Sequence, residues 1–195
     1  MGRLHLIRHG QAAWQLSRDG DFDSPLTELG HRQAQALAAW AERGGAAGSG
    51  GAVKVVTSPL VRARQTAAYL VTALKAEEEV WPGLAEAAFR VADHLPRRSA
   101  PAGAPSTASS EYLSFKAQAE RVLSRLGEEF HGVRDAFVVT HGGMIKTLLR
   151  VAAGGDGMCF DIYNGSVTQL DWREGRWHLA RLSLCDHIAE NERTR

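Results

Sequence analysis

Short apolar runs alternate with longer stretches of helical spacing along most of the chain. Four apolar runs predict strands, at 4–7, 53–57, 80–81 and 136–140. Apolar side chains at helical spacing predict helices at about 27–43, 59–76, 112–130 and 142–151. Two late runs, 166–172 and 177–184, predict a β-hairpin across Arg173–Arg176. Strands that alternate with helices predict an α/β fold, a three-layer α/β/α sandwich with a mostly parallel central sheet.

Two segments interrupt this pattern. Gly44–Gly51 holds five glycines in eight residues and predicts a flexible loop after the first long helix. Leu95–Ser110 contains three of the chain's six prolines and predicts a long surface loop. We therefore expect a single domain over 1–195, with a cap or loop insertion at about 87–111.

Composition narrows the classes of partner. The chain is 44% hydrophobic and 23% charged, as in folded domains, and its 23 basic and 22 acidic residues leave a net charge of +1. This balance argues against a nucleic-acid binder. Two cysteines at 159 and 185, no signal-peptide pattern and no apolar run of about 18 residues indicate a cytoplasmic protein without a membrane span. A homodimer is left open.

Candidate chemistry gathers where the predicted strands end. The first strand runs into Arg8-His9-Gly10, and the last parallel strand runs into His141-Gly142-Gly143. The strand at 53–57 is followed by a helix that begins near Arg62. Ligands of such sheets bind beyond the carboxyl ends of the strands, so these side chains are expected to share one site.

These residue types suit phosphoryl transfer. A neutral imidazole is a good nucleophile near neutral pH, and arginine guanidinium groups grip phosphate oxygens in two places. The start of the helix at Gly142 would add backbone N–H groups and the positive end of a helix dipole. The sequence contains neither a metal-binding motif nor a nucleotide-binding Walker loop. We therefore expect no metal and no cofactor.

The order of the motifs resembles the histidine phosphatase superfamily, also called the phosphoglycerate mutase-like family. Leu6–Gln11 resembles its Arg-His-Gly motif, and four later segments resemble further family motifs in the same order: Ser24–Ala34, Ser58–Ala67, Thr140–Gly143 and Asn164–Thr168. The resemblance covers nearly the whole chain and implies the phosphoglycerate mutase-like α/β/α fold.

The resemblance implies a role for each matching residue. His9 would be the nucleophile that becomes phosphohistidine, and Arg8, Arg62 and His141 would form the phosphate pocket with it. Glu86 lies where the family places its acidic proton donor. A leaving alkoxide needs such a proton, and a carboxyl group in an anion-binding pocket can keep one.

The chain departs from the family pattern near the pocket. Ala12 and Gln15 replace the Ser or Thr and the Asn that the family often has. Gln15 could still donate a hydrogen bond to phosphate from its longer side chain, and the helix start at Gly142 is the other expected phosphate contact. The stretch after Glu86 lacks the usual Gly-x-Trp-Glu-Gly, and the natural substrate therefore stays open. Three arginines in this segment, at 90, 97 and 98, are either grips for a second acidic group or solvated loop residues.

The sequence thus predicts a metal-independent phosphomonoesterase of the histidine acid phosphatase type, acting on a small phosphorylated metabolite. A phosphoglycerate mutase is the first alternative, because it would return the phosphoryl group to a bound substrate instead of water. A catalytically weak relative that binds phosphorylated ligands is the second.

Overall fold

The strands of the computed structural model form one mixed sheet. The model describes residues 2–17, 21–44, 53–96, 107–130, 133 and 135–195. Within these ranges the sheet has six strands in the order β3-β2-β4-β1-β5-β6. They are β1 (Arg3–Arg8), β2 (Val53–Thr57), β3 (Glu78–Val80), β4 (Asp135–Thr140), β5 (Val167–Arg173) and β6 (Arg176–Leu184). The first four pair in parallel and the late hairpin adds two antiparallel strands, as predicted.

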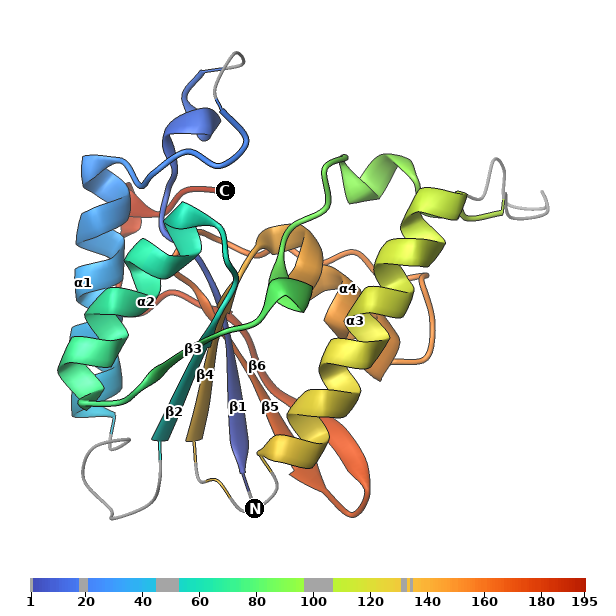
Figure 1. Cartoon of the computed structure of the whole chain (residues 1–195). Coiled ribbons are helices and arrows are strands. Elements are labelled where there is room, and N and C mark those ends of the chain that lie inside the picture. The colour runs from blue at the N-terminus through green and yellow to red at the C-terminus, as the bar shows by residue number, and fades with distance from the viewer. Residues whose placement is uncertain (1, 18–20, 45–52, 97–106, 131–132, 134) are drawn as a thin grey trace.

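Helices cover both faces of this sheet. Figure 1 shows α1 and α2 on one face and α3 and α4 on the other, which confirms the predicted three-layer α/β/α arrangement. The helices are α1 (Glu28–Arg43), α2 (Val61–Leu74), α3 (Ser110–Glu129) and α4 (Gly142–Ala152). The described residues also form four 3₁₀ turns: η1 (Ala13–Gln15) before α1, η2 (Pro82–Leu84) and η3 (Val91–Asp93) between α2 and α3, and η4 (Glu190–Glu192) after β6.

Side-chain alternation along the central strands divides the core in two. Leu6 and Val138 belong to the apolar cluster under α3 and α4, and their neighbours Ile7 and Val139 belong to the cluster under α1 and α2. All four side chains are fully buried. Burial of an aliphatic side chain of this size contributes about 1.5–3 kcal/mol, so both layers hold the central strands in place.

Two helix starts illustrate how local chemistry sets the boundaries. Thr27 caps α1, because its hydroxyl oxygen accepts a hydrogen bond from the Gly30 N–H at 3.0 Å. The helix predicted from Pro59 begins two residues later, at Val61. Its first N–H donates to the distant Asp23 carboxylate at 2.7 Å, a cap that spacing along the chain cannot reveal. The predicted loops fall largely outside the described residues, which leave out 45–52 and 97–106.

The register of the parallel strands aligns their carboxyl ends. Arg8 lies opposite Thr140, and Thr57 lies opposite Val139. The chain then continues each ladder by one bond, since His9 N–H donates to the Thr140 carbonyl at 3.0 Å and Ser58 N–H donates to the Val139 carbonyl at 2.9 Å. The residues that follow the three strands are therefore brought to one edge of the sheet.

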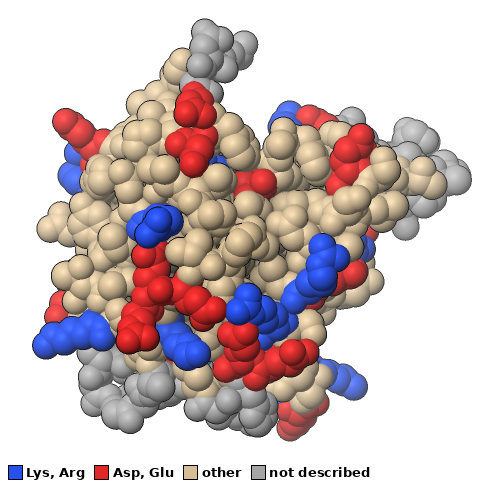
Figure 2. All heavy atoms as spheres, in the orientation of Figure 1, with Lys and Arg blue, Asp and Glu red and all other residues tan. Residues whose placement is uncertain are grey.

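The surface carries both signs of charge. On the face drawn in Figure 2, Lys and Arg side chains are interspersed with Asp and Glu side chains. None of the described helices is long and apolar enough to cross a membrane.

A small hydrogen-bonded group of buried polar side chains lies beside the apolar clusters. His5 in β1 donates from Nε2 to the Asp135 carboxylate at 2.9 Å and accepts at Nδ1 from the Gln169 amide at 3.3 Å. Its ring stacks on Phe137 with centroids 4.5 Å apart. The hydrogen bond between His5 and Asp135 joins β1 to β4, the two strands that carry the histidine motifs.

We predict that Asp135→Ala lowers the free energy of unfolding by about 2–3 kcal/mol, because it leaves a buried His5 N–H without its acceptor. Denaturant unfolding followed by circular dichroism measures the change. Glu120→Ala on the exposed surface of α3 is the control and should change stability by less than about 0.5 kcal/mol. Equal effects of the two substitutions would contradict the prediction.

Candidate active site

Five polar side chains meet at the carboxyl edge of the sheet. Arg8 ends β1 and His9 follows it, Arg62 lies in the first turn of α2, and His141 precedes the first residue of α4. Glu86 follows η2 and reaches the start of α4. The structure brings together the five residues to which the sequence assigned catalytic roles.

The hydrogen bonds of His9 define which ring nitrogen carries the proton. Nδ1 lies 2.6 Å from the Gly10 carbonyl oxygen, which can only accept, so Nδ1 carries the hydrogen. Nε2 lies 3.1 Å from Nε of Arg62, which can only donate. The Nε2 lone pair is thus directed at a guanidinium group, where a bound anion would also lie.

The surroundings of His9 favour its uncharged form. Burial lowers the pKa of His9 well below its ordinary value, and the nearby His141, Arg8 and Arg62 lower it further. The hydrogen bond to Gly10 acts in the opposite direction. The ring is therefore neutral, with Nε2 unprotonated, at neutral pH.

Neutral carbonyl groups hold the two arginines in position. Nη1 of Arg62 donates to the Phe22 carbonyl at 2.6 Å, and Nη1 of Arg8 donates to the Ile162 carbonyl at 2.6 Å. The only ion pair of Arg62 within the described residues is a 4.0 Å contact with Asp23. Burial lowers the pKa of Arg8 to about 10, so its guanidinium remains protonated at neutral pH. Nε of Arg8 is buried and has no partner in the described structure.

His141 lies beside His9 and is held by a serine. The two rings have centroids 5.1 Å apart, and Nε2 of His141 lies 2.7 Å from the Ser58 hydroxyl oxygen. The other nitrogen, Nδ1, is buried without a partner among the described residues. Burial, Arg62 and Arg8 together lower the pKa of His141 well below its ordinary value. A buried polar atom without a hydrogen-bond partner destabilises the fold, and a hydrogen bond to a bound ligand would remove this cost.

Glu86 is bound to the first turn of α4. Its Oε2 accepts from the Gly143 N–H at 2.8 Å, and its Oε1 accepts from the Ala87 N–H at 3.1 Å. Burial raises the pKa of Glu86, although these two hydrogen bonds and the charges of Arg8 and Arg62 oppose the rise. Gly143 permits the approach, because a Cβ there would lie 2.4 Å from Oε1.

The edge of the sheet thus presents a neutral imidazole, two fixed guanidinium groups and a carboxyl group with a raised pKa. The family model described as "Histidine phosphatase superfamily (branch 1)" matches residues 4–184. The chain belongs to the histidine phosphatase superfamily. The match includes every residue of the site described above.

Curated relatives in this superfamily carry the name probable phosphoglycerate mutase GpmB. The protein from Proteus mirabilis is 35% identical over 88 residues, which cover 44% of this chain and 38% of that protein. The chain therefore spans well under half of that relative in this match. A longer match, to the protein from Yersinia pestis (strain Pestoides F), is 26% identical over 91% of this chain and 88% of that protein.

Solved structures of phosphatases share the fold. A mutant phosphoserine phosphatase from Entamoeba histolytica, in complex with phosphoserine, has a TM-score of 0.72 at 23% identity and covers 97% of this chain and 100% of that chain. A mycobacterial glucosyl-3-phosphoglycerate phosphatase, in a complex with VO3, has a TM-score of 0.69 at 25% identity over 93% of this chain and 98% of that chain. The likeness places this chain on the fold of histidine phosphatases.

Gln15 has a different set of partners from the one the sequence suggested. Its amide oxygen accepts from the Ala12 N–H at 2.9 Å, and its amide nitrogen donates to Asn164 Oδ1 at 3.0 Å and to the Arg195 carbonyl at 3.1 Å. These bonds occupy both ends of the amide and connect the loop after His9 to the segment before β5. Contact between Gln15 and phosphate stays a prediction.

Of the three arginines of the expected cap, Arg90 lies within the described residues. Arg90 is exposed and lies 3.7 Å from the Asp93 carboxylate. The other two, at 97 and 98, lie outside the described residues. For Arg90, this geometry supports the simpler of the two interpretations, a solvated loop residue.

Three residues of the site escaped the sequence assignment. Ser58 contacts His141 as described, the Thr66 hydroxyl accepts from the Gly10 N–H at 3.1 Å, and the Asn164 amide donates to the His9 carbonyl at 3.1 Å. Ser58 follows β2 immediately, so the strand-end rule could have found it. Thr66 and Asn164 lie in two segments that resemble family motifs, but their contacts with Gly10 and His9 join distant parts of the chain and have no periodic signal in the sequence.

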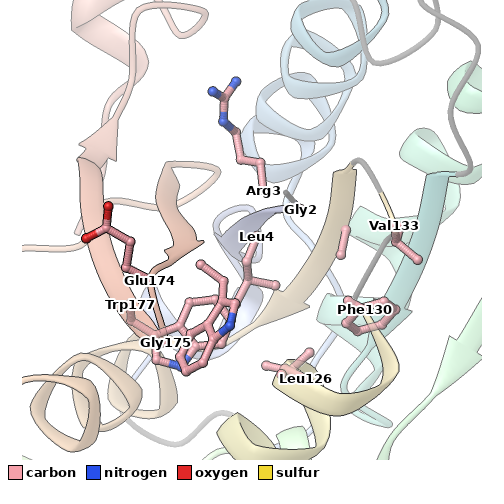
Figure 3. A pocket seen from close by; sticks show the side chains of 12 residues that line it. Gly2, Arg3, Leu4, Leu126, Phe130, Val133, Glu174, Gly175 and Trp177 are labelled. Carbon is pink, nitrogen blue, oxygen red and sulfur yellow. The ribbon is translucent and has the colours of Figure 1, made fainter.

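A separate cavity lies at the opposite end of the sheet. It has a volume of about 360 Å³ and is lined by apolar side chains that include Leu4, Leu126, Phe130 and Trp177 (Figure 3).

Among the described residues, no group of three or more His, Cys, Asp or Glu side chains is arranged to hold a metal ion.

We predict that His9 keeps a neutral ring, protonated at Nδ1, as the pH falls through the ordinary pKa of histidine. Burial and the adjacent cations make protonation of Nε2 unfavourable, so the titration should shift to lower pH than that of free histidine. Nitrogen-15 NMR of histidine-labelled protein distinguishes the two ring nitrogens. A protonated Nε2 at neutral pH would show that the arrangement described above is wrong.

Proposed function

We propose that this chain is a metal-independent phosphomonoesterase that acts through a phosphohistidine intermediate on a small phosphorylated metabolite. The observation that carries the proposal is the His9–Arg62 hydrogen bond, which directs an unprotonated imidazole nitrogen at a buried guanidinium group. A phosphoryl group bound by that guanidinium would lie against the nucleophile.

Hydrogen-bond donors around His9 provide the proposed phosphate site. Arg8 Nε, which is buried without a partner in the described structure, and the Arg62 guanidinium can donate to phosphate oxygens, and His141 Nδ1 can do so when it carries a proton. The start of α4, at Gly142, adds the positive end of a helix dipole. Phosphoryl transfer depends mainly on such positioned donors, because charge spreads over the equatorial oxygens in the transition state.

In the first half-reaction, the Nε2 lone pair of His9 attacks phosphorus in line with the ester oxygen. The N–P bond forms as the P–O bond breaks, and the leaving oxygen takes the proton of Glu86. Burial raises the pKa of Glu86 and so favours its protonated form in the enzyme–substrate complex.

In the second half-reaction, water attacks the phosphohistidine. Glu86, now a carboxylate, takes a proton from the water as the new P–O bond forms. The N–P bond breaks and its electrons return to Nε2, which restores the neutral ring and releases inorganic phosphate. In a mutase a hydroxyl group of a bound substrate would replace the water.

The mutase is retained as a second candidate because the curated relatives are named probable phosphoglycerate mutases. The choice depends on access of water, and thus on the proposed cap over 87–111. In the described part of this segment, Arg90 is exposed and lies near Asp93, and it is not positioned to bind a second substrate. This observation favours the phosphatase.

We predict that the wild-type chain releases phosphate from p-nitrophenyl phosphate and from glycerol 3-phosphate without added metal, and that His9→Ala lowers turnover by at least about 10³-fold. Rapid quenching with labelled substrate should trap an acid-labile phosphoenzyme. His178→Ala on the exposed strand β6 is the matched control and should retain activity.

Two outcomes would redirect the assignment. Isomerisation of a phosphoglycerate without net release of phosphate would favour the mutase. Binding of phosphate without any phosphoenzyme would favour a catalytically weak relative.

We predict that Glu86→Gln lowers kcat/KM for glycerol 3-phosphate by about 10²–10⁴-fold, because an alkoxide leaves poorly without a proton donor. The loss for p-nitrophenyl phosphate should be less than about tenfold, since p-nitrophenolate needs no proton to leave. In the wild type, the alkyl phosphate rate should fall as the pH rises through the raised pKa of Glu86, and the variant should lack this fall.

Gly143→Ala provides a second variant of the same contact. Its Cβ would lie 2.4 Å from Glu86 Oε1 and displace the carboxyl group, so it should reproduce the leaving-group effect in weaker form. Gly127→Ala in α3 is the control, because a Cβ there meets only the Trp177 ring at 3.8 Å. Equal losses for both substrates would contradict the role of Glu86.

A further inference from the structure

One face of α4 is directed at the proposed active site. A Cβ on Gly142 would lie 3.4 Å from Arg8 Nε, and a Cβ on Gly143 would lie 2.4 Å from Glu86 Oε1. Lys146 follows these residues by four and three positions, so it lies on the same face one turn further along the helix. Residues 144 and 145, on other faces, are fully buried in the core.

Lys146 is a half-buried cation without a partner. Within the described ranges the structure gives its ammonium group neither a hydrogen bond nor a salt bridge, whereas Lys116 donates to the Asp156 carboxylate at 2.8 Å. Burial lowers the pKa of Lys146, and the charge of Arg8 lowers it further, while Asp161 and Glu86 act in the opposite direction. These influences agree with the position of Lys146 on α4, one turn after the two glycines that face Arg8 and Glu86.

We propose that Lys146 binds a second negative group of the substrate, the carboxylate of a small phosphorylated acid. This inference rests on the proposed function, because it takes the phosphoryl group to lie between His9 and the two arginines. A partly desolvated ammonium gains most from a ligand that brings its own charge. Lys146 would then determine specificity without taking part in the transfer itself.

The spacing along α4 is compatible with a small acid. Three to four residues along α4 correspond to a rise of about 4.5–6 Å from the glycines that contact Glu86 and Arg8 to Lys146. A carboxylate separated from the phosphate oxygen by two or three carbon atoms spans a distance of this order. The substrate class is therefore a short-chain phosphorylated carboxylic acid.

The local charges favour a carboxylate over a second phosphate. Lysine is a compact point charge and lacks the fork with which arginine grips a phosphate dianion. The Asp161 carboxylate also acts on Lys146 and offsets part of its charge. A single negative charge suits this balance better than two.

The matched ligands 3-phosphoglycerate and glycerol 3-phosphate test the inference, because the first has a carboxylate where the second has a hydroxymethyl group. Binding is measured by calorimetry in a His9→Gln background, so that neither ligand is consumed. We predict that Lys146→Met weakens binding of 3-phosphoglycerate by about tenfold and that of glycerol 3-phosphate by less than about twofold. Lys146→Arg should restore most of the difference.

Lys54→Met controls for overall charge, because Lys54 lies on β2 beside Phe130, with Nζ 5.6 Å from the ring centroid, and should leave both affinities unchanged. Equal weakening of both ligands by Lys146→Met, or no weakening of either, would overturn the inference. Turnover of p-nitrophenyl phosphate by the chain with His9 intact is measured in parallel. Its absence together with intact ligand discrimination would refute the proposed function and leave the Lys146 subsite standing.

Discussion

The site depends on one hydrogen bond, in which Arg62 donates to the unprotonated nitrogen of His9. A guanidinium group cannot face a protonated imidazole in this way, since both would be donors and both would be charged. The bond therefore requires a neutral ring, with its proton held on the opposite side by the Gly10 carbonyl. Burial and the neighbouring cations meet that requirement by lowering the pKa of His9. The same cations that keep the ring neutral are those that would receive an anion.

The manner in which the arginines are anchored follows from this constraint. The shortest hydrogen bonds of Arg8 and Arg62 go to the carbonyl groups of Ile162 and Phe22, which fix the guanidinium planes without cancelling their charge. Carboxylate anchors at the same distance would leave less positive potential for a ligand. Glu86, whose charge also acts on both arginines, is instead bound to backbone N–H groups and has a raised pKa. The positive charge of the two arginines is thus left available for a bound anion.

Much of this arrangement could be predicted from the sequence because it follows from strand ends. Apolar runs located β1, β2 and β4, and the rule for parallel sheets brought His9, His141 and Arg62 to one edge. The contacts that support them could not be predicted in the same way. Gln15 bonds to Asn164 and Arg195, and Asp23 caps α2, through pairings far apart in the chain that leave no periodic signal. The sequence thus located the candidate site residues, and the structure shows the side chains that orient them.

The position of β1 has a consequence for how the chain acquires this site. The strand that delivers Arg8 and His9 lies between β4 and β5, so that Arg3 pairs with Asp135 on one side and with Asp171 on the other. β1 precedes the other five strands along the chain, yet it is a central strand, and both its edges pair with residues far later in the sequence. Bringing such distant residues together closes long loops, which costs entropy before any contact repays it. His9 therefore acquires its surroundings only when strands far along the chain have joined β1.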